Sequence, residues 1–304
     1  MGTTGLRRRH TAFAAVLATF ALALGLTAAP AGAAPARDVD YVAFGDSYTA
    51  GTGAGAPYRP ANVACWQSSG GYVDVVAKTG RIDVVANKAC HGAVLDSDSR
   101  FYDREIIIPT VMEQILMATL ARQLSHDTEL VSITAGANDL GFASVIGACA
   151  SGTSAECSEA LAIASDPATV EQMQTNLVEA LVWIRTVAPH AKIAVLGYPY
   201  LFDPASPFAP IPPETQLVIN QAADGLNTIL KGTVQVLNQA YGNFQFVDVR
   251  NKFIGHAVNS VNPWLQLLLA QPTPDYNFHP NKEGHRAYAS ALLEAVKPAQ
   301  LARP

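Results

Sequence analysis

The 304-residue sequence predicts an α/β protein built on a five-stranded parallel sheet that helices cover on both faces. Two observations point to this fold class. Short β-rich runs alternate with longer segments of helical periodicity, and each run is bounded by Gly, Asn, Asp or Pro. The composition agrees, because 49% of the residues are hydrophobic and only 15% are charged, which excludes disordered, collagen-like and coiled-coil classes.

The expected elements alternate along the chain. The strands, which are rich in Val, Ile and Phe, are Val39–Phe44, Ile82–Ala86, Leu130–Thr134, Lys192–Leu196 and Phe244–Val249. The helices expected between and after them are Tyr72–Lys78, Thr110–Leu124, Val170–Val187, Glu214–Tyr241 and Asn281–Lys297. In the second helix, apolar residues recur at three- and four-residue steps and therefore share one face. We see no linker, repeat or biased tract that would divide the sheet.

The N-terminus has the pattern of an export signal. Arg7, Arg8 and Arg9 precede an uncharged Ala- and Leu-rich run, which small residues and prolines follow. This order predicts a signal peptide, residues 1–34, that is removed from a single domain, residues 35–304. A membrane anchor is the alternative, but the Ala and Thr content of the run favours cleavage. We therefore expect a secreted monomer without stable membrane insertion.

Charge and cysteine content narrow the function further. Loss of the three arginines changes the formal net charge from −5 to −8, and the sequence has no basic stripe for nucleic-acid binding. In an oxidising compartment the four cysteines are expected to form disulfides, most simply the sequential pairs Cys65–Cys90 and Cys149–Cys157. Four cysteines permit three connectivities, so the other pairings stay open. No CxxC or CxxH spacing suggests a metal site.

Functional side chains follow the predicted strands. Ser47 comes after the first strand, Gly92 after the second and Asn138 after the third, while His279 lies near the end of the chain. Open α/β sheets bind ligands at the carboxyl ends of their strands. A serine nucleophile needs a base and oxyanion donors, which His279, the Ser47 and Gly92 N–H groups and the Asn138 carboxamide could supply. Taken singly, each residue also fits a structural role, for example Ser47 as a helix cap.

The same residues resemble the four sequence blocks of the SGNH or GDSL hydrolases, especially the secreted actinobacterial, Streptomyces-type lipases and esterases. The matching blocks are Gly45-Asp46-Ser47-Tyr48, Asn87–Gly92, Gly136-Ala137-Asn138-Asp139 and His279-Pro280. The resemblance implies a flavodoxin-like three-layer α/β/α sandwich with no metal or organic cofactor. It also implies ester hydrolysis through an acylated Ser47, with His279 as general base and then acid, and an oxyanion hole of Ser47, Gly92 and Asn138.

One departure concerns the group that orients His279. The family's common triad has Asp three residues before the histidine, where this chain has Tyr276, and Asp275 lies four residues before it. A one-residue offset can move a carboxylate out of reach of the imidazole. Some members of the family use a backbone carbonyl of the same loop instead. We therefore predict a Ser47–His279 dyad oriented by the Tyr276 carbonyl, with Asp275 as the alternative.

Three other histidines have different expected positions. His256 is the rival base, because it follows a glycine in a loop. His91 adjoins Gly92, and His285 falls within the last predicted helix; both are expected at the surface.

The leading function is a serine esterase or lipase acting on small-molecule or lipid esters. Phospholipase A and polysaccharide deacetylase are alternatives on the same scaffold, and a non-catalytic anion-binding module around Gly51–Gly55 is a weaker one. The segment Leu201–Pro213 is rich in Pro and Phe, so Phe202 and Phe208 are expected to form an apolar wall of the acyl site.

Overall fold

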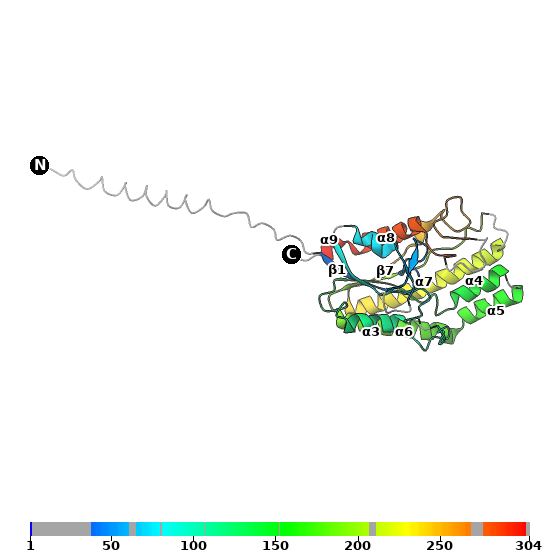
Figure 1. The fold of residues 1–304 in the computed structure, drawn as a ribbon, viewed down its shortest axis with the longest axis horizontal. Helices are drawn as coiled ribbons and strands as arrows, with labels where there is room; N and C mark the ends of the chain where they lie inside the picture. The colour runs from blue at the N-terminus through cyan, green and yellow to red at the C-terminus, as the bar shows by residue number, and fades with distance from the viewer. Residues whose placement is uncertain are drawn as a thin grey trace. The chain divides into compact units, whose positions relative to one another are not determined.

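A computed structural model describes Met1 and residues 38–60, 65–79, 81–106, 108–151, 153–206, 211–268 and 276–301 (Figure 1). Apart from Met1, the predicted signal peptide lies outside the described residues, and so do Asp275 and Phe208. Among the described residues, no helix is both long and apolar enough to cross a membrane.

A five-stranded parallel sheet forms the centre of the fold. Its strands, in spatial order, are β4 (Ile82–Asn87), β1 (Val39–Gly45), β5 (Leu130–Thr134), β6 (Lys192–Leu196) and β7 (Phe244–Val247). Every predicted strand is present, and the last ends two residues earlier than expected. Helices cover both faces of the sheet, which explains why β5 is buried at all five positions. A separate antiparallel pair joins β2 (Pro57–Tyr58) to β3 (Gln67–Ser68).

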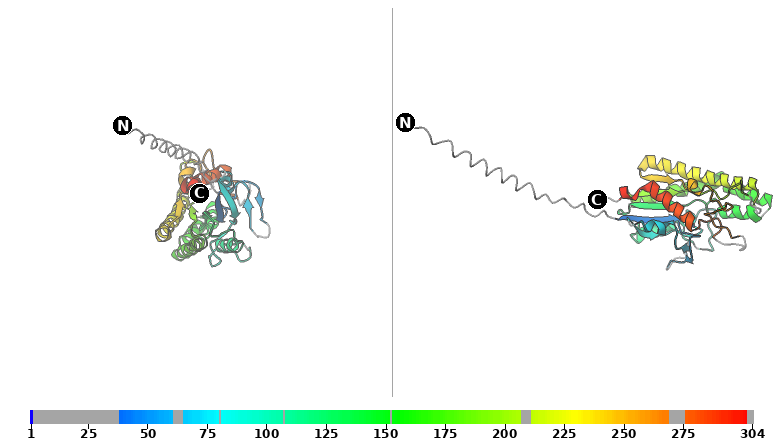
Figure 2. Two further views of the ribbon diagram at one scale, coloured as in Figure 1. Left: turned by 90° about the vertical axis from the view of Figure 1, so that its left-hand side faces the viewer. Right: turned by 90° about the horizontal axis from the view of Figure 1, so that it is seen from above.

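The helices form the two outer layers. One face carries α2 (Tyr72–Ala77) and α8 (Lys282–Val296), and the other carries α3 (Val111–Leu120), α6 (Pro167–Val187) and α7 (Pro213–Tyr241) (Figures 1 and 2). A short 3-10 turn, η1 (Arg250–Phe253), follows β7, and the helix α9 (Pro298–Leu301) follows α8. The three-layer α/β/α sandwich predicted from the sequence is confirmed.

Besides α9, two neighbouring helices were not predicted. The helices α4 (Phe142–Ser151) and α5 (Ser154–Ala164) follow β5 as a hairpin, before α6 begins. Thr153 starts α5 through a capping box, in which its hydroxyl accepts the Glu156 N–H and the Glu156 carboxylate accepts the Thr153 N–H. A disulfide between Cys149 and Cys157 joins the two helices. The hairpin is therefore fixed covalently beside the carboxyl end of β5.

Candidate active site

Ser47 lies in the turn that follows β1. The last residue of that strand, Gly45, has a φ of +127°, and a Cβ at this position would overlap the Thr134 carbonyl, so the turn requires glycine. The Gln114 carboxamide of α3 accepts the Gly45 N–H at 2.9 Å and donates to the Gly45 carbonyl at 3.0 Å. The end of β1 is therefore held by both the sheet and a helix, and Ser47 is only 6% exposed.

His279 reaches Ser47 from the loop before α8. Its Nε2 atom lies 2.7 Å from Ser47 Oγ, and its Nδ1 atom lies 3.0 Å from the Asn277 carbonyl oxygen. A neutral imidazole whose Nδ1–H donates to this carbonyl presents Nε2 as an acceptor to the serine hydroxyl. Burial lowers the pKa of His279 from 6.5 to about 3, with a further lowering by His91. The ring is therefore neutral at the pH at which a base is needed.

The group that orients His279 differs from the prediction. The Asn277 carbonyl faces Nδ1, whereas the Tyr276 carbonyl accepts the backbone N–H of His279 at 3.1 Å. The Nδ1 atom is thus paired with the carbonyl one residue after the predicted Tyr276, although a hydrogen bond to the Tyr276 carbonyl also raises the pKa of His279. The reason lies in the backbone, because Phe278 adopts a left-handed φ of +62° that the sequence does not reveal. The alternative, Asp275, lies outside the described residues.

The loop that carries His279 is fastened at several points. The hydroxyl of Tyr48 donates to the Phe278 carbonyl at 2.7 Å, and the Tyr48 ring lies 5.4 Å from the His279 ring. On the other side, Gln266 exchanges backbone hydrogen bonds of 2.8 Å with Phe278 and His279. Tyr48 follows Ser47 directly in the sequence, so one turn supplies both the serine and a support for its partner. The sequence predictions gave Tyr48 no separate role.

Asp46 links the same turn to the buried side chains around it. Its carboxylate accepts the Tyr48 N–H at 3.0 Å, the Thr134 hydroxyl at 2.7 Å and the Tyr198 hydroxyl. Burial raises the pKa of Asp46 to about 6, against the lowering effect of these hydrogen bonds. The sequence predictions gave this residue no role, although a carboxylate placed directly after a buried strand must find such partners.

Gly92 and Asn138 lie on neighbouring loops beside Ser47. Gly92 has a φ of +78°, and Asn138 donates one carboxamide N–H to the Ala93 carbonyl at 2.8 Å. The next residue, Asp139, accepts the Leu95 N–H at 3.0 Å, so two adjacent side chains tie the loop after β5 to the loop after β4. Burial raises the pKa of Asp139 to about 7. The predictions likewise gave no role to Asp139.

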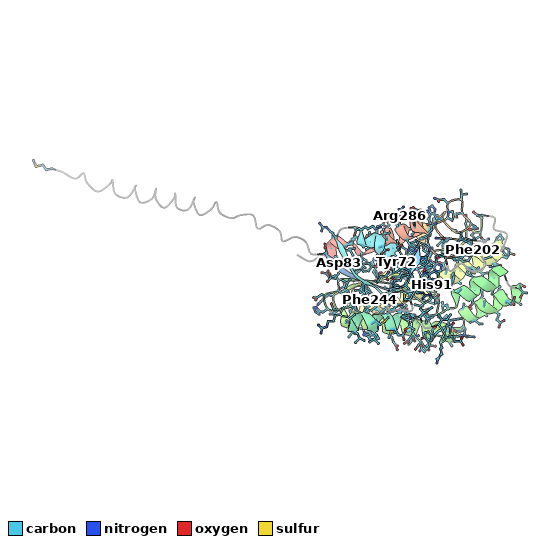
Figure 3. All side chains as sticks on the ribbon, viewed as in Figure 1. Tyr72, Asp83, His91, Phe202, Phe244 and Arg286 are labelled. Atoms are coloured by element: carbon cyan, nitrogen blue, oxygen red, sulfur yellow. A yellow bond between two sulfur atoms is a disulfide. The ribbon has the colours of Figure 1, made fainter. Side chains whose placement is uncertain are left out.

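The remaining histidines lie in different surroundings. His91, which is labelled in Figure 3, is half-buried and lines the same cavity as Ser47, with its Nδ1 atom 3.0 Å from the Thr52 hydroxyl, so the surface position expected for it is only partly correct. His285 is fully buried, because α8 packs on α2, and its Nε2 atom lies 3.0 Å from the Thr52 carbonyl. The rival base His256 stacks on Trp264 instead and is not among the described residues that line the cavity.

A cavity of about 860 Å³ opens from these residues. Ser47, Gly92, Asn138 and His279 all line it. From there it extends along α4, α5 and α7, whose lining residues are mostly Ala, Val, Ile, Leu and Gly. Of the described residues in the predicted wall, Leu201–Pro213, Leu201 lines the cavity, whereas Phe202, which is labelled in Figure 3, is buried against Phe278.

The structure also joins Cys65 to Cys90, which places both disulfides next to the cavity loops. Cys90 precedes Gly92 by two residues, and its N–H donates to the Gly45 carbonyl at 3.0 Å. Both sequential pairs named in the sequence analysis are therefore present. Among the described residues, no group of three or more His, Cys, Asp and Glu side chains could hold a metal ion.

The chain is similar to several known lipases. A model of the GDSL-like lipase/acylhydrolase family matches residues 43–287. A lipase of Streptomyces rimosus is 32% identical over 297 residues, which span 96% of this chain and 99% of that lipase. The crystal structure of an extracellular lipase from Streptomyces rimosus superposes with a TM-score of 0.68 and 29% identity, covering 85% of this chain and all of that one. Phospholipase A1 from Streptomyces albidoflavus gives a TM-score of 0.66 and 28% identity, with 84% and 98% covered.

The family match spans the four blocks noted in the sequence, from the strand before Ser47 to beyond His279. A 27% identical protein, which spans 95% of this chain, is an esterase of Streptomyces scabiei. The chain therefore belongs to the GDSL-like lipase/acylhydrolase family and is a carboxylic-ester hydrolase.

Proposed function

We propose that the protein is a secreted lipase or esterase that works through an acyl-Ser47 intermediate. The observation that supports this most directly is the 2.7 Å contact between Ser47 Oγ and His279 Nε2 at one end of an apolar cavity. A serine hydroxyl paired with a neutral imidazole can be deprotonated as it attacks.

In the proposed first step, Ser47 Oγ attacks the ester carbonyl carbon while His279 Nε2 takes the hydroxyl proton. The carbonyl oxygen becomes an oxyanion, which the N–H groups of Ser47 and Gly92 and the second carboxamide N–H of Asn138 stabilise. His279 then returns the proton to the leaving alcohol oxygen as the carbon–oxygen bond breaks.

Water completes the cycle by the same path in reverse. His279 takes a proton from the water as its oxygen attacks the acyl carbon, and the bond to Ser47 Oγ breaks as the serine regains its proton. The Asn277 carbonyl keeps the imidazole in the required tautomer throughout. No carboxylate is needed for this role in the proposed dyad.

Export and cleavage after about residue 34 are part of the proposal. The basic, apolar and small-residue segments of the N-terminus support it, as do two disulfides in the mature part. The remaining residues, 35–304, would then act as one domain, which we expect to be a monomer. The N-terminal sequence of the exported protein tests the cleavage site.

Phospholipase A activity is the second candidate, because phospholipase A1 from Streptomyces albidoflavus superposes on this chain. Deacetylation of polysaccharides is less well supported, since the cavity beyond Ser47 has mostly apolar walls. An apolar wall offers few hydrogen-bond partners to sugar hydroxyl groups.

The deciding experiment measures p-nitrophenyl butyrate hydrolysis and labelling by a serine-reactive organophosphonate. Ser47→Ala should abolish labelling, and both Ser47→Ala and His279→Ala should lower kcat about 10⁴-fold or more. His256→Ala is the matched control and should keep kcat within about threefold of the wild type. A labelled Ser47→Ala protein, or an equal loss in His256→Ala, would contradict the proposed assignment.

A further inference from the structure

We propose that the part of the cavity between α4–α5 and α7 binds the acyl chain of a long, unbranched lipid ester. We call this part the α4–α7 groove and define it by Val145, Ile146, Gly147, Leu161, Val218 and Gly225. The proposal rests on the ester-hydrolase function, and it adds the substrate class and the residues that select it.

The chemistry of the groove fits a hydrocarbon chain. Among the described residues that line the cavity there is no Lys, Arg or Glu, and the one carboxylate, Asp46, is bonded to Tyr198 and Thr134. Val218 is 40% exposed where the groove meets solvent, so an apolar side chain borders its open side. Because no cationic side chain of the described residues lines it, the groove cannot form a charge-assisted hydrogen bond with a phosphate group. The part of a lipid ester that fits its apolar walls is the acyl chain.

The size of the groove also favours a chain longer than acetyl. The whole cavity, of which the groove is one part, has a volume of about 860 Å³, near the upper end of the range of about 300–1,000 Å³ seen for small-molecule sites. An acetyl group would leave most of the apolar wall in contact with water. A long chain gains about fourfold in binding for each methylene that the wall covers.

Two glycines keep the groove open. Gly147 on α4 and Gly225 on α7 both line it, and a Cβ at either position would meet no heavy atom of the described residues within 4 Å. Neither has a positive φ, so the helix backbone does not require glycine, and glycine weakens a helix relative to alanine. Both glycines are exposed, so the missing side chains leave the wall of the groove open to solvent and to a ligand.

The α4 wall is also held in place. Cys149, which lies two residues after Gly147, is linked to Cys157 of α5. Ala150 of α4 and Leu161 of α5 line the groove on either side of this link. The wall that a chain would contact is thus a covalently closed helix pair.

The test compares p-nitrophenyl dodecanoate with p-nitrophenyl butyrate for the wild type, Gly225→Leu and Gly147→Leu. Each leucine fills open space, so we expect kcat/KM for the dodecanoate to fall about 10-fold or more, while kcat/KM for the butyrate stays within about twofold. Gly232→Leu is the matched control. Gly232 lies seven residues further along α7, also with no heavy atom within 4 Å of an added Cβ, but it is not among the cavity-lining residues described.

The outcomes separate the groove from the chemistry. An unchanged dodecanoate-to-butyrate ratio in both variants, or an equal fall in Gly232→Leu, would overturn the groove while leaving ester hydrolysis intact. Failure of the wild type to hydrolyse butyrate, with no labelling of Ser47, would overturn the proposed function instead.

Two parallel assays, on trioctanoylglycerol emulsions and dioctanoylphosphatidylcholine micelles, identify the source of the chain. Gly225→Leu should lower the rate on whichever of these two lipids the wild type hydrolyses. An unchanged rate on that lipid would contradict acyl-chain binding in the α4–α7 groove.

Discussion

The loop end of the sheet and the α4–α7 groove beside it are built from different interactions. At the loop end, Ser47 and His279 are surrounded by hydrogen bonds, among them those of Asp46, Tyr48 and Asp139. The groove is lined mainly by aliphatic side chains and by glycines that open onto empty space. In the proposed function, the loop end makes and breaks bonds, and the groove only contacts the acyl chain.

The largest effect that separates the two regions is expected at Asn138. Asn138→Ala removes a proposed oxyanion donor, so kcat should fall about 10²- to 10³-fold, because the developing negative charge would lose a hydrogen bond. Steady-state kinetics on the butyrate and dodecanoate esters check this. The fall should be the same for both chain lengths, and a chain-length-dependent fall would place Asn138 in the groove rather than in the chemistry.

A smaller effect is expected at Tyr48. Tyr48→Phe keeps the ring against His279 but removes the hydrogen bond to the Phe278 carbonyl, so His279 loses alignment and kcat should fall about 10-fold with KM unchanged. Tyr288→Phe is the control, because its hydroxyl also donates to a backbone carbonyl, that of Gly197. It should lower thermal stability while kcat stays within about threefold. Equal kcat values for Tyr48→Phe and the wild type would show that the other contacts of the loop, such as those of Gln266, hold His279 in place without the Tyr48 hydroxyl.

The smallest expected effect concerns stability rather than rate. The pKa of Asp139 is raised to about 7 in the folded state, so the folded protein holds this proton more tightly than the unfolded chain does. The resulting stabilisation of the folded state is complete below about pH 4 and is lost as the pH rises through about 7. Asp139→Asn keeps an acceptor for the Leu95 N–H and removes the buried charge. From pH 5 to pH 8 its free energy of unfolding, relative to that of the wild type, should rise by about 2–3 kcal/mol.

Urea unfolding at both pH values measures this difference. Asp83→Asn, at an exposed position on β4, is the control and should show no such change (Asp83 is labelled in Figure 3). A pH-independent difference for Asp139→Asn would mean that the carboxyl group stays protonated, or stays ionised, across the whole range.

The sequence predicted the regular part of the fold closely. The bounds of β5 and β6 were predicted to the residue, because each is a short apolar run between clear turn residues. The α4–α5 hairpin was missed, since Phe142–Ser151 mixes Gly, Cys and Ser with apolar residues, and Ser154–Ala164 has little amphipathic periodicity and no buried residue. Its position depends on the disulfide and on packing against α7.

The sequence predicted which residues line the site, but not all of their contacts. Ser47, Gly92, Asn138 and His279 follow strand ends or precede a helix, and the topology brings them to one cavity. The acceptor for His279 Nδ1 was misassigned, because it depends on the backbone conformation of Phe278. Similarly, the burial of His285 arises from contact between α8 and α2, which lie far apart in the chain.

The Gln114 carboxamide gives Gly45 both an acceptor and a donor where β1 ends. One side chain of α3 thus supplies the pairing that a further strand residue would otherwise provide. The Gly-Asp-Ser turn therefore depends on a helix that is distant from it in the sequence. If the Gly-Asp-Ser segment were grafted onto another parallel sheet, Gly45 would lose both hydrogen bonds to Gln114. A graft that keeps the conformation of the turn would therefore have to include α3.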